Sequence, residues 1–233
     1  MVDTAKDSRV LVLEDALRRL NEIVDNRKMR VHLDYTRMSE ILKAAGTLLY
    51  QVKYSYVEPK ALAEMDATKR LVSAVADVAS IRETAVKASA YRPKTTKEIE
   101  VTAEFSYAVR IVQGFPRRMQ ECGDDPAYAV DILALEITEL CPVEGSKNLT
   151  ECRCTDGSRV WHVVTNIRGL KQGVKLPCAV LPPVDMMGVV SEAMFLASEP
   201  LQPSVKLGTI TSLSTSALDQ ARAHVLNIIK RMV

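Results

Sequence analysis

The chain has 233 residues, of which 47% are hydrophobic, and its formal net charge is +2. This length and apolar content suffice for one large core or two modest ones, and we predict two domains. The nearly balanced charge excludes a protein that binds nucleic acid through a global basic excess. Any nucleic-acid site must therefore rest on local basic patches.

The sequence contains no run of 18 consecutive apolar residues, and its first ten residues, MVDTAKDSRV, lack the apolar core of a secretory signal. We therefore predict a soluble, cytoplasmic protein without a membrane partner. The five cysteines are an odd number in a chain too long to need disulfide bonds. Reduced thiols are expected.

The first half of the chain has helical periodicity. Apolar residues recur with the spacing of one helix face from Leu13 to Val24, and again from Met38 to Val52. A third helix is predicted to begin at Pro59, because proline is favoured in the first turn, and to reach the neighbourhood of Tyr91.

A fourth helix is predicted after Thr95, because Thr95 and Glu98 have the spacing of a capping box. Gly114 and Pro116 are expected to end or kink it. Four amphipathic helices in succession predict an antiparallel helical domain over residues 1–125, which either closes its own core or pairs with a second copy.

From Gly123 onward the apolar period shortens toward two, which is typical of strands. Asp156 and Gly157 form a favoured hairpin turn. The predicted strands cover residues 130–138, 149–155, 159–165, 176–181 and 189–197. Short strands with turn residues between them predict a five-stranded β-barrel over residues 126–212.

The tail, residues 213–233, is predicted to form a closing helix capped near Ser216, which packs on the helical domain or on a partner subunit. The predicted fold class is therefore α+β.

Several short segments of the second half match a known family in order and spacing. They are Asp131-Ile132, Val163-Val164-Thr165-Asn166, Leu181, Pro183, and Gly188-Val189-x-Ser191-Glu192-x-Met194. On these segments, residues 130–212 resemble the EMAP-type tRNA-binding domain, an OB-fold module that occurs with aminoacyl-tRNA synthetases and in stand-alone tRNA-binding proteins. The whole chain resembles archaeal predicted RNA-binding proteins with a C-terminal EMAP-type domain. The resemblance implies tRNA as the partner, a homodimer, and an aminoacyl-tRNA synthetase as a further candidate partner.

The candidate RNA-binding residues lie in the predicted barrel. Six cations could dock phosphates: Lys147, Arg153, Arg159, Arg168, Lys171 and Lys175. Trp161 either stacks on an unpaired base or fills the interior. Asn166, Ser191 and Glu192 belong to the matching segments, and the Ser-Glu pair either contacts RNA or bonds the backbone of a neighbouring turn.

The charges also support an alternative. Residues 130–212 contain seven Lys and Arg against nine Asp and Glu, and residues 182–187 carry no positive charge. The barrel could therefore be a protein-interaction or dimerisation module that uses Val184, Met186 and Met187. Two basic pairs outside the barrel, Arg117-Arg118 and Lys230-Arg231, are either solvated helix ends or an extension of an RNA footprint.

The sequence gives little support for catalysis or for a cofactor. The three histidines lie on three different predicted elements, and no nucleophile turn or phosphate-binding glycine loop is present. Cys152 and Cys154 share a strand face, but the sequence offers no second closely spaced pair for zinc. We predict a noncatalytic protein without a metal or cofactor.

Overall fold

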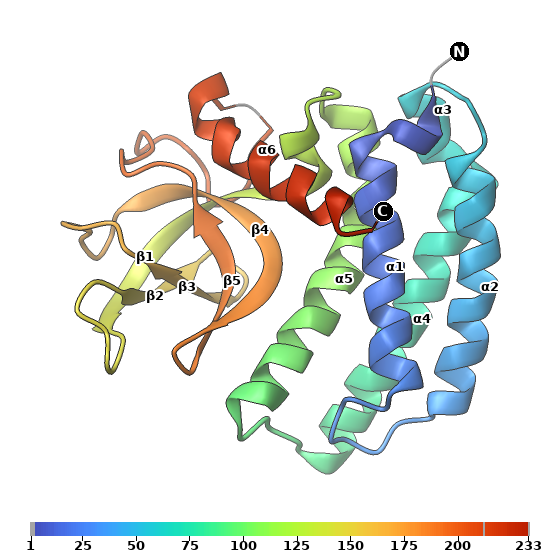
Figure 1. Cartoon of the computed structure of the whole chain (residues 1–233), viewed down its shortest axis with the longest axis horizontal. Coiled ribbons are helices and arrows are strands. Elements are labelled where there is room, and N and C mark those ends of the chain that lie inside the picture. The colour runs from blue at the N-terminus through green and yellow to red at the C-terminus, as the bar shows by residue number, and fades with distance from the viewer. Residues whose placement is uncertain (1–2, 212, 233) are drawn as a thin grey trace.

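The computed structural model describes residues 3–211 and 213–232. The chain has an α+β fold in which a helical first half is followed by an antiparallel sheet and a last helix (Figure 1). The helices are α1 (Ser8–Asp25), α2 (Tyr35–Lys53), α3 (Pro59–Glu64), α4 (Asp66–Ser89), α5 (Thr96–Glu121) and α6 (Thr215–Lys230), with short 3₁₀ turns η1 (Thr4–Lys6) and η2 (Pro126–Ala129). The strands are β1 (Ile132–Pro142), β2 (Thr150–Thr155), β3 (Val160–Thr165), β4 (Lys175–Met186), β5 (Val189–Phe195) and β6 (Gly208–Thr209).

The apolar faces predicted for the first helices form the core of the helical half. Leu13 and Leu20 of α1 and Met38 and Leu42 of α2 are fully buried. The helix α1 packs on α2 and α5, and α4 packs on α2 and α5. Packing of these four helices buries the stripe of each one, as the periodicity predicts.

The predicted third helix is two helices. The chain is extended at Met65 (ψ 139°), which separates α3 from α4. The hydroxyl of Thr68 donates to the carbonyl of Leu62 (2.7 Å). This bond replaces the backbone hydrogen bond that the carbonyl would accept in a continuous helix.

The fourth helix begins as predicted, with Thr95 accepting from the amide of Glu98 (3.2 Å). The prediction that it ends or kinks near Gly114 and Pro116 is wrong about its end, because α5 continues to Glu121. Tertiary contacts of the last turns, described below, outweigh the loss of one backbone donor at the proline.

The sheet has the strand order β3-β2-β1-β4-β5, and every pairing is antiparallel. The predicted hairpin at Asp156-Gly157 joins β2 to β3, with Gly157 at φ +90°. A sixth strand, β6, adds to β1. The backbone ladders among the described residues give an open sheet that curls in space (Figure 1), and not the predicted closed cylinder.

The last helix lies across the top of the molecule and packs on α1 and η2, where Arg222 pairs with Asp125 (2.7 Å) (Figure 1). It begins at Thr215 with Ser214 as N-cap, two residues before the predicted cap at Ser216. The predicted boundary at residue 212 lies outside the described residues. Within the described part of the chain, we find no helix with the length and apolarity needed to cross a bilayer.

Candidate nucleic-acid interface

The turn between β2 and β3 is organised by the carboxylate of Asp156. It accepts hydrogen bonds from the hydroxyl (2.7 Å) and the amide (2.8 Å) of Ser158, the amide of Arg159 (3.0 Å) and Nε1 of Trp161 (2.9 Å). Burial acts to raise the pKa of Asp156, but these hydrogen bonds outweigh it and lower the pKa to about 2. The ionised carboxylate therefore holds the turn and the tryptophan ring together.

Trp161 occupies the interior position, one of the two predicted for it. Its side chain is 1% exposed. The guanidinium of Arg159 lies 3.5 Å from the centre of the ring, and that of Arg110 on α5 lies 5.2 Å from it. Because protein atoms cover the ring, it offers no stacking surface to a base and instead joins the sheet to α5.

The Ser191-Glu192 pair bridges the two end strands of the sheet. The hydroxyl of Ser191 on β5 accepts from the amide of Val164 on β3 (3.0 Å). Glu192 accepts from the amide of His162 on β3 (3.3 Å) and from Arg159 (3.0 Å). The pair thus bonds backbone groups as one prediction stated, although these groups belong to a strand and not to a turn.

Three of the six predicted phosphate-binding cations are engaged within the protein. Arg153 faces Glu139 across the β1–β2 ladder and pairs with it (2.7 Å). Arg159 pairs with Glu192, and the ammonium of Lys175 donates to two backbone carbonyls at 3.1 Å. These contacts compete with any phosphate for the same donors.

The other three cations form what we call the loop cluster, which consists of Lys147, Arg168 and Lys171. All three are exposed, and the structure gives them no carboxylate partner among its described residues. Lys147 and Arg168 line one groove of about 530 Å³ between the β1–β2 and β3–β4 loops. Asn148 accepts from Arg168 there (3.3 Å) and ties the loops together. Asn166 is exposed but lines a different groove.

A buried arginine cluster, which the sequence did not predict, connects α5 to the start of β1. Asp131 is 4% exposed and accepts from Arg110, Arg117 and Arg118, each at 2.7 Å. Burial acts to raise the pKa of Asp131, and the three guanidinium groups outweigh it and lower the pKa.

The neighbouring residues of α5 are adapted to this cluster. Arg118 is 1% exposed and also donates to the carbonyl of Ile111. A Cβ atom on Gly114 would lie 2.5 Å from Nη1 of Arg118. The basic pair Arg117-Arg118 is therefore structural, and the spacing of Arg110, Gly114 and Arg118 on one helix face is the sequence signal for it.

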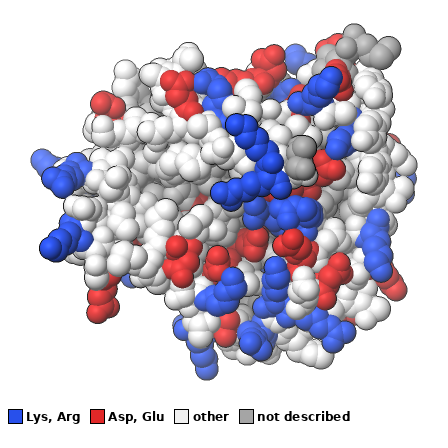
Figure 2. Space-filling view, in the orientation of Figure 1, with Lys and Arg blue, Asp and Glu red and all other residues white. Residues whose placement is uncertain are grey.

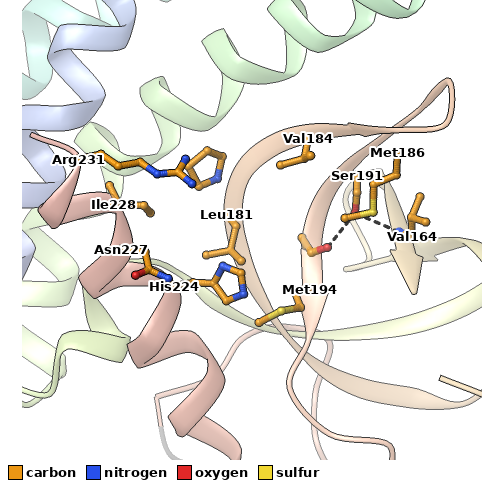
Figure 3. A pocket seen from close by; sticks show the side chains of 12 residues that line it. Val164, Leu181, Val184, Met186, Ser191, Met194, His224, Asn227, Ile228 and Arg231 are labelled. Carbon is orange, nitrogen blue, oxygen red and sulfur yellow. Dashed lines mark hydrogen bonds between the residues drawn. The ribbon is translucent and has the colours of Figure 1, made fainter. Parts of the chain in front are cut away.

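An apolar groove of about 280 Å³ lies between α6 and the sheet, where Figure 2 shows a broad area without charged side chains. Figure 3 shows His224 and Ile228 of α6, and Arg231 just after it, on the side of the groove opposite Leu181 and Met194 of the sheet. The predicted apolar patch is divided: two of its members line the groove, namely Val184 and Met186. The third, Met187, is 57% exposed and lies against the β1–β2 loop at Gly145.

Three of the four cysteines of the sheet, Cys152, Cys154 and Cys178, are buried free thiols. Burial raises the pKa of Cys152 and of Cys154 to about 12 and that of Cys178 well above its usual value. Such thiols are poor nucleophiles at neutral pH.

Comparison with known proteins gives one result for the helical half. No curated protein matches the chain at a significant level. A family model described as "Alpha helical domain" matches residues 1–122. The match ends one residue after α5. The match stops before the sheet, so the EMAP-type resemblance of residues 130–212 stays a prediction. Since the match covers more than half of the sequence, the chain belongs to this alpha helical domain family.

Proposed function

We propose that the protein is a noncatalytic RNA-binding protein that recognises a structured RNA by its shape and by phosphate contacts at one end of the sheet. The RNA that we propose first is tRNA. The observation that carries the proposal is the loop cluster. Its three exposed cations come from two neighbouring loops, and none has a carboxylate partner among the described residues. Lys147 and Arg168 line one groove, and Lys171 follows Arg168 in the same loop. Cations of this kind can exchange their counterions for phosphates, which is the main source of nucleic-acid affinity.

The proposal includes that the sheet acts as an OB-type barrel. The hydrogen bonds of Ser191 and Glu192 to β3 take the place of a backbone ladder between the end strands. In OB-folds the loops between strands 1 and 2 and between strands 4 and 5 border the ligand. Here Gly145 of the first loop lies beside Met187 of the second, so the two loops meet at the same end as Lys147.

The test is a titration of labelled total tRNA with the whole protein at several salt concentrations. We expect an affinity that falls steeply with salt. The variant K147A/R168A/K171A should bind more weakly, and the slope of log K against log salt should be shallower by about 3, since each lost phosphate contact removes about 1.

The matched control is K43A/K60A/R70A, which removes the same charge from exposed positions on α2, α3 and α4, helices that lie away from the sheet (Figure 1). The control should bind tRNA like the unchanged protein. Equal losses in both variants would mean that net charge alone sets the affinity, and tRNA binding that ignores salt would contradict the proposal.

A second candidate is a dimerisation module, favoured by the groove beside α6. Val184 is 51% exposed at this groove. If two copies meet there, light scattering should give a dimer, and Val184→Glu should give a monomer because it buries an unpaired charge in the contact. A monomeric unchanged protein would remove this candidate.

A further inference from the structure

The loop between α1 and α2 holds its cations outward in a fixed arrangement. Between residues 28 and 33 buried and exposed side chains alternate, with Met29, Val31 and Leu33 at 8%, 5% and 5% exposed. Because Met29, Val31 and Leu33 are buried against the helices, Lys28 and Arg30 are left exposed to solvent.

Aromatic contacts stiffen the same loop. The hydroxyl of Tyr35 donates to the carbonyl of Met29 (2.9 Å), and the guanidinium of Arg27 lies 5.8 Å from the centre of the Tyr35 ring. A loop that is anchored in this way loses little conformational entropy when its cations bind a ligand.

The loop between α4 and α5 is built in a comparable way. Ala90, at φ 49°, ends α4 in the left-handed conformation. Glu98 then accepts from the amide of Lys94 (2.8 Å) and from the hydroxyl of Tyr91 (3.2 Å). These bonds fix the turn and leave Arg92 and Lys94 exposed.

The two loops lie at the same end of the helices, the lower end in Figure 1. Arg30 of the first loop is close enough to the second to affect its titrating groups. The pKa of Glu98 is lowered chiefly by its hydrogen bond from Lys94, and the charge of Arg30 lowers it further. We call the Lys and Arg of these loops the basic end: Arg27, Lys28, Arg30, Arg92, Lys94 and Lys97.

The basic end is strongly positive. Residues 26–34 and 90–98 contain six Lys and Arg but only two carboxylates, a net of +4 against +2 for the whole chain. Both carboxylates are engaged by backbone amides, since Asp34 accepts from Arg37 (3.0 Å) and Glu98 from Lys94 (2.8 Å). Neither carboxylate forms an ion pair with the basic end among the residues described.

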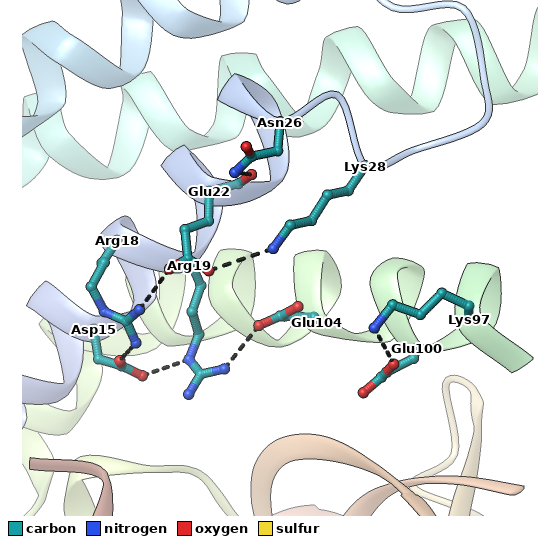
Figure 4. Close-up of polar contacts among 9 residues, drawn as sticks. All are labelled: Asp15, Arg18, Arg19, Glu22, Asn26, Lys28, Lys97, Glu100 and Glu104. Carbon is teal, nitrogen blue, oxygen red and sulfur yellow. Dashed lines mark hydrogen bonds and ion pairs between the residues drawn. The ribbon is translucent and has the colours of Figure 1, made fainter. Parts of the chain in front are cut away.

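The adjoining surface of α1 and α5 is different because its charges are paired. Figure 4 shows Arg19 between Asp15 (2.6 Å) and Glu104 (2.9 Å). At the edge of the basic end, Lys28 is 3.5 Å from Glu22.

Lys97 is paired as well, with Glu100 (2.7 Å). Four cations of the basic end, Arg27, Arg30, Arg92 and Lys94, have no such partner within the described ranges.

The basic end also borders the sheet. The hydroxyl of Thr96 at the start of α5 donates to the carbonyl of Gly188 in the β4–β5 turn (3.3 Å). Pro93 and Gly188 line one groove of about 450 Å³, which continues along α5 to Ser106 and along β3 at His162. The two carboxylates in its lining have partners there, since Glu192 pairs with Arg159 (3.0 Å) and Glu151 lies 2.7 Å from Nδ1 of His162. An RNA strand bound at the loop cluster could therefore reach the loops of the helical domain through this groove.

We infer that the basic end is the second half of the RNA footprint, in which the helical domain binds the phosphate backbone of the same RNA that occupies the sheet. This inference rests on the proposed function. The four unpaired cations on anchored loops suit a polyanion, and the groove shared with the β4–β5 turn favours RNA over a membrane surface.

The test compares the variant R30A/R92A/K94A with the K147A/R168A/K171A variant and with the K43A/K60A/R70A control, in each case with labelled total tRNA. Loss of the basic end should weaken binding at low salt at least about tenfold and make the salt slope shallower by about 3. The charge-preserving variant R30K/R92K should keep most of the affinity, which separates a charge effect from a folding defect. Thermal melting followed by circular dichroism should be unchanged, because the substituted side chains are exposed.

The outcomes are distinguishable. If the unchanged protein binds no tRNA, the proposed function fails and the inference fails with it. If the loop-cluster variant loses affinity while R30A/R92A/K94A binds like the control, only the inference is overturned. Binding of vesicles that contain phosphatidylserine, lost in R30A/R92A/K94A while tRNA binding is kept, would assign the basic end to membranes and would also overturn it.

Discussion

Removal of the Asp131 carboxylate tests the connection between the helices and the sheet. Asp131→Ala leaves Arg118 buried and without its partner, and Arg118 is only 1% exposed. Breaking one buried ion pair from one side costs about 3–5 kcal/mol. The side chains of Arg110 and Arg117 are 32% and 29% exposed, so they can turn to water and add about 0–1 kcal/mol each.

We therefore expect Asp131→Ala to lower the free energy of unfolding by about 3–7 kcal/mol, a large part of the ~5–15 kcal/mol of a typical domain. Urea unfolding can be followed by the fluorescence of Trp161, the only tryptophan, which lies beside Arg110. The matched control is Asp124→Ala, an exposed position seven residues away, which should change stability by less than about 0.5 kcal/mol.

A double variant sharpens this test. In D131L/R118M both charges are replaced by apolar groups, so no buried charge is left without a partner, and the loss should be smaller than in Asp131→Ala. A loss below about 1 kcal/mol in Asp131→Ala, or the same loss in the double variant, would refute the view that the carboxylate compensates a buried arginine.

Three further predictions concern the packing of two glycines, the charge of Asp156 and the burial of three cysteines. Gly114→Ala should destabilise the protein by about 1–3 kcal/mol, because its Cβ would meet the buried side chain of Arg118. Gly46→Ala, at a position of α2 with open space around it, should stabilise the protein by about 0.5–1 kcal/mol. Urea unfolding gives both values, and equal effects would contradict the packing argument. The pKa of Asp156 is lowered to about 2, so the contribution of its carboxylate to stability is complete above about pH 4 and is lost as the pH falls toward 2. Unfolding curves measured against pH should show this loss of stability. The Asp156→Asn variant should not show it. Cys152, Cys154 and Cys178 should resist iodoacetamide at pH 8 in the folded protein and react in urea, as mass spectrometry can count; fast native labelling would contradict their burial.

The helices were predictable where the signal is local. The apolar stripes of α1 and α2 and the capping box at Thr95 depend on residues within one or two turns, and the structure has them. Pro116 misled the sequence reasoning because α5 is held beyond it by Asp131, which lies 13 residues after Arg118. Propensity is a weak guide where such tertiary contacts compete with it.

The sheet was predictable in its strands and its first hairpin, but the environment of its cations was not. The pairing of Arg153 with Glu139 depends on the β1–β2 register, which includes an irregularity between Ile137 and Glu139. The sequence alone does not place such an irregularity.

The basic end was missed for a different reason. Its two loops are about 60 residues apart in the sequence, and each contributes only three cations, so neither is conspicuous as a charge run. Only the packing of α1, α4 and α5 brings these loops to one end of the helices.

The most direct test of the account is the salt dependence of tRNA binding by the unchanged protein. The loop cluster and the four unpaired cations of the basic end are seven side chains in total, which predicts a slope of log K against log salt of roughly −5 to −6. A slope near zero, or no binding at low salt, would contradict the claim that these cations hold an RNA backbone.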